Sequence, residues 1–538
     1  MSARNKIVTT LLSFLLLIQF VPSASATLFP GFPQDSDIQA LTVEDQMRNS
    51  FSFMSNNVVT ATIGQFGTKT SESPNATRFC DEFNTHGCNV NSDANLSITS
   101  LLPICGEKIE NCIESLEFIK QDGTSVKATF DRYMKGKTFQ GIPDLGMPGG
   151  SRVSLWNAPG IKNLGGTEQY AVNTQLSWNY RQNSIEIMDF NASVFAIKPV
   201  FDSRYKDSGI GFGQTFDQAY GTWTETGEII YDGTCAAVEI GMCAQKVEFA
   251  PDTRIKLNLK LSNKVTGWLK GRISKPEITV TPLNDNFNSL SVIADAVNVP
   301  MMYAQFNRKT ALFDDSASQG RGLYGRSFYR QYPPDGRTAS QVVKLFSESV
   351  KNTATEVHSY WNVSSLANNS QNSCLSDTSK LIGFVTTNAM AYEGNPPSWN
   401  GESLEYKVAG LHYLPDGKTL TSGSYDLMMR SETARCLYNF TNAPISATIS
   451  VTSQEGESKI ATTVVNERKG WLYLAAYGFS FSSPSIKVKL TQEAPATAQA
   501  DTSKVSSKIV SIKCLKGSVL KTIKGTNPKC PTGFKKKP

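Results

Sequence analysis

The stretch from Arg321 to Arg337 has the residue types best suited to recognition chemistry. It reads RGLYGRSFYRQYPPDGR and interleaves guanidinium groups with aromatic rings. Aromatic faces stack on sugars or bases, and guanidinium groups hold carboxylate or phosphate. The competing interpretation is an exposed loop whose rings pack on a neighbouring sheet. If the stretch binds a glycan, its ligand-binding residues are Arg321, Tyr324, Arg326, Phe328, Tyr329, Arg330, Tyr332 and Arg337.

The C-terminal segment concentrates positive charge. Residues 501–538 contain ten lysines and one acidic residue, Asp501, and so carry a formal charge of +9. The whole chain is only +6 and residues 1–26 contribute +2, so residues 27–500 sum to about −5. Such asymmetry is typical of a protein that meets a partner of opposite charge. The lysines expected to anchor that contact are Lys516, Lys521, Lys524, Lys529, Lys535, Lys536 and Lys537.

The same segment predicts a small β hairpin. Gly517-Ser518 forms the expected turn between two short apolar runs, which contain Ile509, Val510 and Ile512 on one side and Val519, Leu520 and Ile523 on the other. A module this short buries too little surface to be stable alone, so we expect a Cys514–Cys530 bridge. The alternative is a solvated tail that only aids solubility.

Catalytic motifs are scarce in this chain. It has three histidines, none in an H-E-x-x-H motif, and it lacks a G-x-S-x-G elbow and any nucleotide-binding fingerprint. His358 and His412 are therefore interpreted as structural residues, and His86 as incidental. We expect no cofactor and no nucleic-acid partner.

Two acidic pairs could serve a glycosidase. They are Asp314-Asp315 and Glu402 with Glu405. However, the chain has 47 acidic residues, which supply many such pairs by chance. We therefore assign no catalytic residue and expect that the protein is not an enzyme.

The N-terminus predicts export. Arg4 and Lys6 precede the apolar run from Val8 to Val21, and Ala24-Ser25-Ala26 resembles a cleavage site. This is the pattern of a secretory signal peptide over residues 1–26. The apolar core is shorter than the roughly 20 residues needed to span a bilayer. We expect no transmembrane segment in the mature chain, and a secreted, extracellular or cell-wall-associated location.

Ten cysteines agree with export, since an even number in an exported chain predicts disulfides. A zinc site needs closely spaced ligand pairs, which are missing, so no metal is expected. Loop closure is easiest over short separations. The expected bridges are Cys80–Cys88, Cys105–Cys112, Cys235–Cys243, Cys374–Cys436 and Cys514–Cys530.

The predicted fold class is mainly β, with several antiparallel β-sandwich-like domains, at least one packed helix and the small disulfide-stapled basic C-terminal module. Charged residues make up only 19% of the chain, and that balance favours strands. Period-two alternation predicts strands at 170–178 and 255–261. Two alternating runs on either side of Asp122-Gly123 predict a hairpin over residues 115–130.

One helix is predicted, because apolar residues recur at intervals of three and four. A helix docked on a sheet is the preferred interpretation, and a partner-binding helix is the alternative. The apolar stripe consists of Val343, Phe346, Val350, Ala354, Val357 and Trp361.

These patterns divide the chain into seven segments. They are a signal peptide (1–26), an N-terminal loop-rich β region (27–150), a β domain (151–338), a helix and connection (339–373), a β-sandwich-like domain (374–492), a linker (493–507) and the basic C-terminal module (508–538). The linker is small and polar, so the module is expected to be a separate unit.

The tail resembles a short Lys-rich module that ends many secreted proteins of planktonic actinobacteria. The resemblance rests on Cys514…Cys530 and Asn527-Pro-Lys-Cys-Pro-Thr-Gly533. The body is similar to large uncharacterised exported proteins of the same bacteria, through Ser154-Leu-Trp-Asn-Ala-Pro-Gly160, Thr266-Gly-Trp-Leu-Lys-Gly-Arg272 and Gly410-Leu-His-Tyr-Leu-Pro-Asp-Gly417. The resemblance implies source and location, and it transfers no catalytic residue.

The function expected from the sequence is that of a secreted cell-surface structural or binding protein. Its basic module would hold it near the wall by contact with an anionic cell-wall polymer or membrane surface, and a glycan is a further candidate partner. The alternatives are a secreted polysaccharide-active, glycosidase-like enzyme and a carbohydrate-binding protein.

Overall fold

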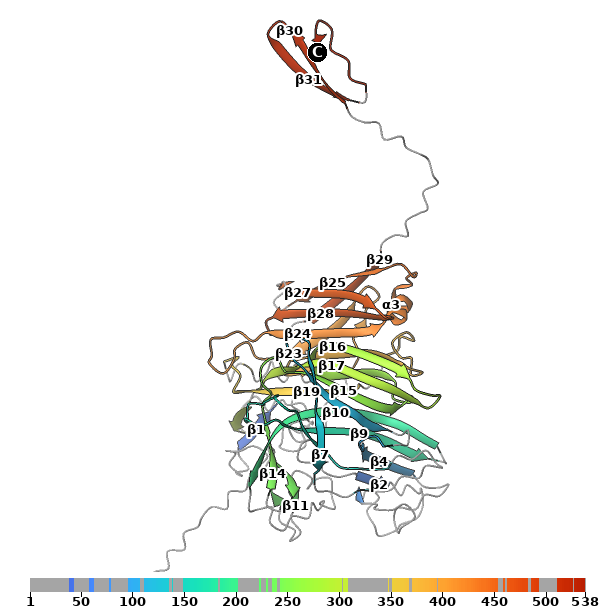
Figure 1. Cartoon of the computed structure of the whole chain (residues 1–538), viewed down its shortest axis with the longest axis vertical. Helices are drawn as coiled ribbons and strands as arrows, with labels where there is room; N and C mark the ends of the chain where they lie inside the picture. Colours follow the sequence, from blue (N-terminus) through green and yellow to red (C-terminus); the bar gives the residue numbers. More distant parts are fainter. Residues whose placement is uncertain are drawn as a thin grey trace, which may run out of the picture. The chain divides into compact units, whose positions relative to one another are not determined.

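The computed structural model describes residues 38–42, 58–61, 77–78, 95–106, 111–134, 138, 149–181, 184–201, 222–223, 229–230, 235–239, 242–301, 303–307, 347, 351–366, 370–393, 395–452, 458–459, 462–481, 485–492, 510–525 and 527–537. Within these ranges the chain is mainly β with several antiparallel sheets, as predicted (Figure 1). It separates into two compact units, residues 1–491 and 492–538. We call the first unit the body and residues 510–537 of the second unit the module, and describe each by itself.

The body contains the strands up to β29. The first are β1 (Ile38–Thr42), β2 (Val58–Ala61), β3 (Thr77–Arg78), β4 (Asn95–Leu101), β5 (Cys112–Ile119), β6 (Ser125–Lys127), β7 (Thr129–Tyr133), β8 (Ser154–Asn157), β9 (Gln169–Arg181), β10 (Ser184–Phe201), β11 (Thr222–Trp223), β12 (Ile229–Ile230), β13 (Cys235–Glu239), β14 (Met242–Val247) and β15 (Arg254–Ser262).

The later elements of the body surround its one described helix, α3 (Ser431–Tyr438). They are β16 (Gly267–Pro282), β17 (Phe287–Met301), β18 (Tyr303–Asn307), β19 (Glu356–Leu366), β20 (Leu381–Thr387), β21 (Ala391–Tyr392), β22 (Ser398–Trp399), β23 (Leu404–Ala409), β24 (Gly423–Arg430), β25 (Ile445–Thr452), β26 (Ser458–Lys459), β27 (Thr462–Arg468), β28 (Trp471–Phe479) and β29 (Ser485–Gln492).

Alternation of apolar and polar residues predicts a strand correctly where one face of the strand is buried and the other is exposed. In β15 the even-numbered residues are half-exposed, whereas Ile255, Leu257, Leu259 and Leu261 are buried. β15 lies between β5 and β17 and pairs antiparallel with both. The predicted hairpin is also present, because β5 pairs with β6 across a turn in which Gly123 has φ 83°.

Strand β16 joins the two halves of the body. It pairs antiparallel with β17 and β19 and parallel with β20. The regions 151–338 and 374–492, which the sequence separates into two domains, are thus hydrogen-bonded to each other along one strand. Beyond β20 the sheet continues through β24, β28 and β27, each antiparallel to the strand before it. Figure 1 shows these three strands above β16 and β17.

Two hydrophobic cores lie on either side of this junction. The first is built by β5, β9, β10, β15, β16, β17 and β19. The second lies between the ladder β20–β24–β28 and a separate sheet ordered β21-β23-β29-β25-β26. Trp268 belongs to the second core, whereas Leu269 and Ile273 of the same strand belong to the first.

Helix α3 covers part of the second core. Its Ala434 and Leu437 are buried there. The helix ends at Asn439, which adopts a left-handed conformation (φ 52°) and donates its backbone N–H to the carbonyl of Arg435. Cys436 on this helix is bridged to Cys374, as predicted.

Three predicted disulfides are present in the described residues: Cys105–Cys112, Cys374–Cys436 and Cys514–Cys530. The predicted pairs Cys80–Cys88 and Cys235–Cys243 lie outside the residues whose side chains the structure describes.

The prediction of a helix reaching Trp361 is wrong. Val357 and Trp361 lie in strand β19, which pairs with β10, β16 and β17. The interval of four between them fits a strand as well as a helix, and β19 is buried on both faces at Ser359–Ser364, so no alternation marked it. Of residues 340–350, only Ser347 is described, and it is helical.

A glycine at the β16–β20 junction generates a prediction. A Cβ built on Gly383 would lie 2.1 Å from Cζ3 of Trp268. The indole is buried, and its Nε1 donates to the Leu375 carbonyl (2.9 Å). Moving the ring away would therefore cost both packing and this hydrogen bond. We expect Gly383→Ala to destabilise the body by about 1–3 kcal/mol or more, measured by urea unfolding.

Gly106→Ala is the matched control, because a Cβ there would meet nothing within 4 Å. Equal unfolding midpoints for the two variants would contradict the packing described at the junction.

Candidate functional site

The module is a three-stranded antiparallel sheet. Strand β30 (Val510–Lys516) pairs with β31 (Val519–Gly525) and with β32 (Lys535–Lys536). The predicted two-residue turn is present, and Gly517 provides its positive φ of 56°. The Cys514–Cys530 bridge ties β30 to the 526–534 connection, which supplies the covalent constraint that so small a core requires.

The two faces of this sheet differ. One face, which we call the inner face, carries Cys514, which is fully buried, together with the half-buried Ile512 and Ile523. The 530–534 segment lies against it: the Lys521 ammonium is 5.4 Å from the Phe534 ring centroid, and a Cβ on Gly533 would be 3.1 Å from Lys516 Nζ.

The opposite face of the sheet, the outer face, is uncovered. Leu515 and Leu520 are cross-strand partners on it and are 37% and 47% exposed. The register places Lys513, Lys524 and Lys535 on the same face. Complete burial of a leucine is worth about 1.5–3 kcal/mol, so leaving this pair half-exposed forfeits stability that a small module needs.

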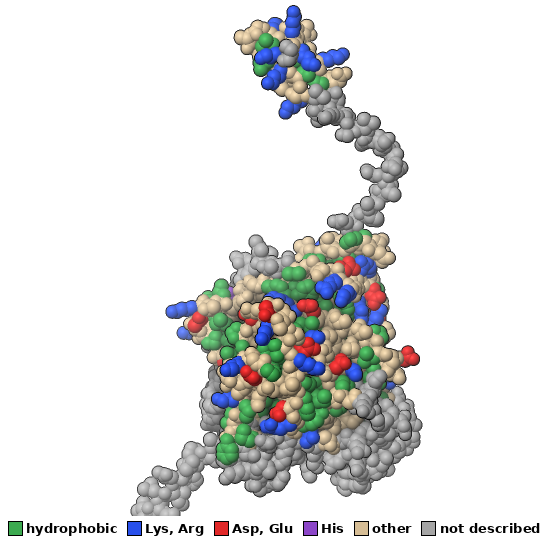
Figure 2. All heavy atoms as spheres, in the orientation of Figure 1, with side chains coloured by type: hydrophobic (Ala, Val, Ile, Leu, Met, Phe, Trp, Pro, Cys, Tyr) green, Lys and Arg blue, Asp and Glu red, His purple; other side chains and the backbone are tan. Residues whose placement is uncertain are grey.

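The charge of the module has one sign. Residues 510–537 contain eight lysines and no acidic residue, and all eight lysines are exposed. In Figure 2 the charged side chains visible on the module are all basic, whereas the visible face of the body mixes both signs. The seven lysines selected from the sequence are among the eight. Sequence reasoning missed Lys513 and the Leu515–Leu520 pair, which period-two alternation from Cys514 could have assigned to one face.

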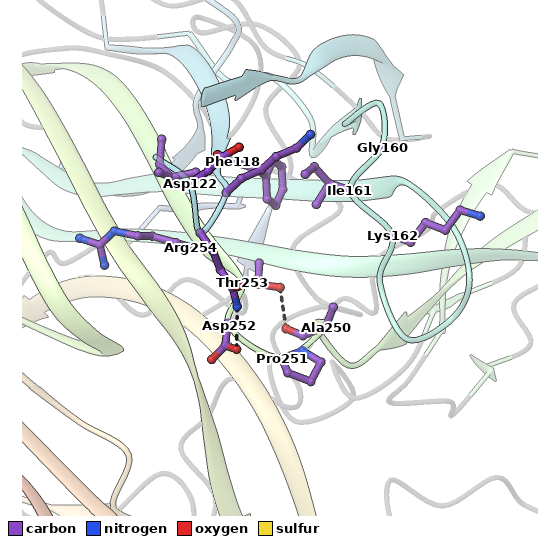
Figure 3. A pocket seen from close by; sticks show the side chains of 13 residues that line it. Phe118, Asp122, Gly160, Ile161, Lys162, Ala250, Pro251, Asp252, Thr253 and Arg254 are labelled. Carbon is purple, nitrogen blue, oxygen red and sulfur yellow. Dashed lines mark hydrogen bonds between the residues drawn. The ribbon is translucent and has the colours of Figure 1, made fainter. Parts of the chain in front are cut away.

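The body has a shallow pocket of about 450 Å³ where three loops meet (Figure 3). They are the β5–β6 turn, residues 160–162 and residues 250–254. Its polar groups stabilise these loops: Asp122 accepts from the Thr124 N–H (2.8 Å), and Thr253 Oγ1 donates to the Ala250 carbonyl (2.6 Å). In Figure 3 the guanidinium of Arg254 points away from Ile161 and Lys162. We assign this pocket no chemistry.

A second pocket of about 620 Å³ lies between one face of the β24–β28–β27 ladder and residues 275–279 of β16. The β16 segment bends away because the register with β17 shifts between Ser274 and Glu277. Arg254 at the rim donates to Asp295 (2.6 Å) and Glu277 (2.7 Å). The other cationic residues that line this pocket are Lys275, Arg468 and Lys469.

A buried carboxylate lies beneath this second pocket. Asp426 on β24 has no exposed surface and accepts hydrogen bonds from Tyr473 (2.6 Å), Tyr477 and Thr386 (3.2 Å). The Tyr473 and Tyr477 hydroxyl oxygens are also 2.5 Å apart, and both tyrosines line the pocket. Burial raises the pKa of Asp426 to about 6, although its hydrogen bonds act in the opposite direction.

The three mutually contacting oxygens have a simple proton count. The contacts are Tyr473–Asp426, Tyr477–Asp426 and Tyr473–Tyr477. When Asp426 is ionised, only the two phenolic protons are shared among these three contacts. When Asp426 is protonated, its carboxyl group supplies a third proton. Burial is also the main cause that raises the pKa of both phenols, so they stay neutral. Tyr473 and Tyr477 line the pocket together with Arg468 and Lys469, and this combination of aromatic rings and cations suits an anionic small molecule.

The two histidines in the described part of the chain, His358 and His412, are engaged in structural contacts, and His86 lies outside it. His358 lies between two carboxylates, with Nδ1 3.0 Å from Glu248 and Nε2 3.2 Å from Glu356. Burial lowers the pKa of His358, but the hydrogen bonds to both glutamates outweigh it and raise the pKa overall. His412 Nδ1 contacts the Phe481 carbonyl (3.3 Å). Neither ring faces the second pocket.

The candidate glycosidase pair, Glu402 and Glu405, forms ion pairs with lysines. Glu405 is 3.1 Å from Lys487, and Glu402 is 3.8 Å from Lys489 with its side chain 81% exposed. Both carboxylates therefore take part in surface ion pairs on the β23–β29 sheet. Asp314 and Asp315 lie outside the described residues, as do Arg321, Tyr324, Arg326, Phe328, Tyr329, Arg330, Tyr332 and Arg337.

Within the described ranges, no group of three or more His, Cys, Asp or Glu side chains is placed to hold a metal ion. No helix in this part of the chain is long and apolar enough to cross a membrane. No protein-family model matches the chain, and comparisons with curated proteins and with solved structures give no significant match.

The buried carboxylate predicts a pH effect. The pKa of Asp426 is raised in the folded chain above the unfolded value near 3.9. Its contribution to stability is therefore fully present below about pH 4 and is lost as the pH rises through about 6. Since a side-chain amide does not titrate in this range, Asp426→Asn should become more stable relative to the natural chain by about 1 kcal/mol between pH 5 and pH 8.

Urea unfolding at both pH values measures this difference, and Asp285→Asn on the exposed β16–β17 turn is the control. A stability difference for Asp426→Asn that is the same at pH 5 and pH 8 would show that Asp426 is not held in the described environment.

Proposed function

We propose that the protein is a secreted binding protein of the cell surface, and that the module attaches it to an anionic polymer or membrane surface. The observation that carries the proposal is the set of eight exposed lysines without one acidic residue in residues 510–537. The resemblance of the tail to modules of secreted actinobacterial proteins is in keeping with such a location.

The energetics favour attachment by several weak contacts. Each lysine near an anionic surface contributes about 1 kcal/mol at most. The attraction decays over a Debye length of about 8 Å in physiological salt. Because residues 27–500 sum to about −5, the net charge of the body opposes such attraction, and we expect retention to depend mainly on the module.

Removing residues 501–538 from the mature chain should abolish retention on cells and on an immobilised polyphosphate resin. We expect the full chain to bind at about 20 mM salt and to elute by about 0.5 M salt, because the contacts are electrostatic. The truncated chain should flow through while keeping the urea-unfolding midpoint of the body.

A charge-preserving control separates charge from lysine identity. Replacing all eight lysines of the module by arginine should keep retention, whereas replacing them by glutamine should abolish it. If the truncated chain is retained as firmly as the full chain, the module does not provide the attachment.

Glycan binding by the body is a second candidate function, favoured by the second pocket. Its wall carries the rings of Tyr473 and Tyr477, and its rim carries Arg468 and Lys469, which form no ion pair in the described residues. Rings and cations together fit an anionic saccharide.

A glycan array probed with the mature chain tests this second function. Arg468→Gln combined with Lys469→Gln should weaken binding of carboxylated saccharides at least tenfold, whereas Lys418→Gln on the exposed 415–420 turn should leave it unchanged. If the chain binds only uncharged saccharides, and neither the double variant nor the control variant alters that binding, the glycan site does not lie at the second pocket.

A further inference from the structure

We propose that the outer face of the module is a lipid-binding surface. The Leu515–Leu520 pair would enter the headgroup region of an anionic bilayer, while the surrounding lysines contact lipid phosphates. This inference rests on the proposed attachment function and names the substance to which the module attaches.

The first observation is that the two faces have different roles. The inner face is covered by the 530–534 segment and holds the bridge, with Cys514 buried. On the inner face the apolar residues near the bridge are buried or half-buried and Val519, beside the turn, is 53% exposed, whereas both apolar residues of the outer face, Leu515 and Leu520, are 37% and 47% exposed. The outer face is therefore the one available for docking.

The second observation is the combination of groups on that face. In the β30–β31 pairing, Lys513 lies opposite Thr522 and Leu515 lies opposite Leu520. In the β30–β32 pairing, Lys535 lies opposite Leu515 on the same face of the sheet. An apolar pair is therefore bordered by ammonium groups on long flexible stems. Lysines of this kind keep their charge at the interface while the apolar centre goes deeper.

This combination favours a bilayer over a soluble polyanion. A phosphate-rich polymer offers partners for the lysines but none for two exposed leucines. An anionic bilayer offers both, since its surface potential attracts basic groups and its acyl boundary accepts apolar side chains. Binding that uses two kinds of contact is also stronger than either contact alone.

Sedimentation of the mature full chain with lipid vesicles tests the proposal. The probes are vesicles of phosphatidylcholine alone, vesicles with about 30% phosphatidylglycerol, and soluble polyphosphate. We expect binding to the anionic vesicles and little to the neutral ones. Leu515→Ser combined with Leu520→Ser should weaken vesicle binding at least tenfold and leave polyphosphate binding within twofold.

The inner face provides matched controls. Val519→Ser removes an apolar side chain that is 53% exposed but belongs to the inner face, and it should change vesicle binding by less than twofold. Likewise, Lys513→Gln with Lys535→Gln should weaken vesicle binding more than Lys516→Gln with Lys521→Gln. Mass spectrometry of the Cys514–Cys530 peptide verifies that each variant has formed its bridge.

The outcomes separate the two proposals. Binding to polyphosphate without binding to anionic vesicles would overturn the lipid assignment and leave the attachment function standing. Equal losses for the outer-face and inner-face variants would also overturn it. Failure to bind either probe would remove both proposals.

Discussion

The body depends on one strand, β16, whose residues 267–274 are largely buried on both faces. Leu269 and Ile273 pack into the first core, whereas Trp268 packs into the second. The Arg272 side chain on the same strand is 1% exposed, and it donates to the carbonyls of Ala389 and Met390. A buried guanidinium is tolerated only where such acceptors replace water, so β16 and the 389–390 segment fix each other's position.

The same strand also contributes to the second pocket. The first part of β16 contributes side chains to both cores. At the register shift with β17 the strand becomes irregular, and the second pocket lies between the following residues and the β24–β28–β27 ladder. Tyr473 and Tyr477, which donate hydrogen bonds to the buried Asp426, line the same space. The module instead obtains its order from a disulfide and three short strands, so its surface is free to carry charge of one sign.

The sequence predicted those features that depend on near neighbours. Strand β15, the β5–β6 hairpin, the Gly517-Ser518 turn and the short-range bridges all follow from alternation or from small separations. The parallel β16–β20 pairing could not be predicted, because it joins residues more than a hundred positions apart without a local signal. The helix assigned through Val357 and Trp361 failed because a central strand buried on both faces loses its alternation.

The same distinction holds for the candidate sites. The lysines of the module could be selected from composition, since charge needs no tertiary context to be exposed. Asp426 could not, because it lies within the largely apolar run of β24, and only the fold brings Tyr473 and Tyr477 to it. The outer-face pair of Leu515 and Leu520 required knowing which face the bridge covers.

The body is one connected unit along β16, and we propose that surface attachment resides in the module alone. Amide hydrogen exchange on the mature full chain, free and bound to an anionic surface, tests this division most directly. We expect binding to slow exchange only in residues 510–537 and to leave β15 and β16 unchanged. Slowed exchange in the strands of the body, with the module unaffected, would contradict it.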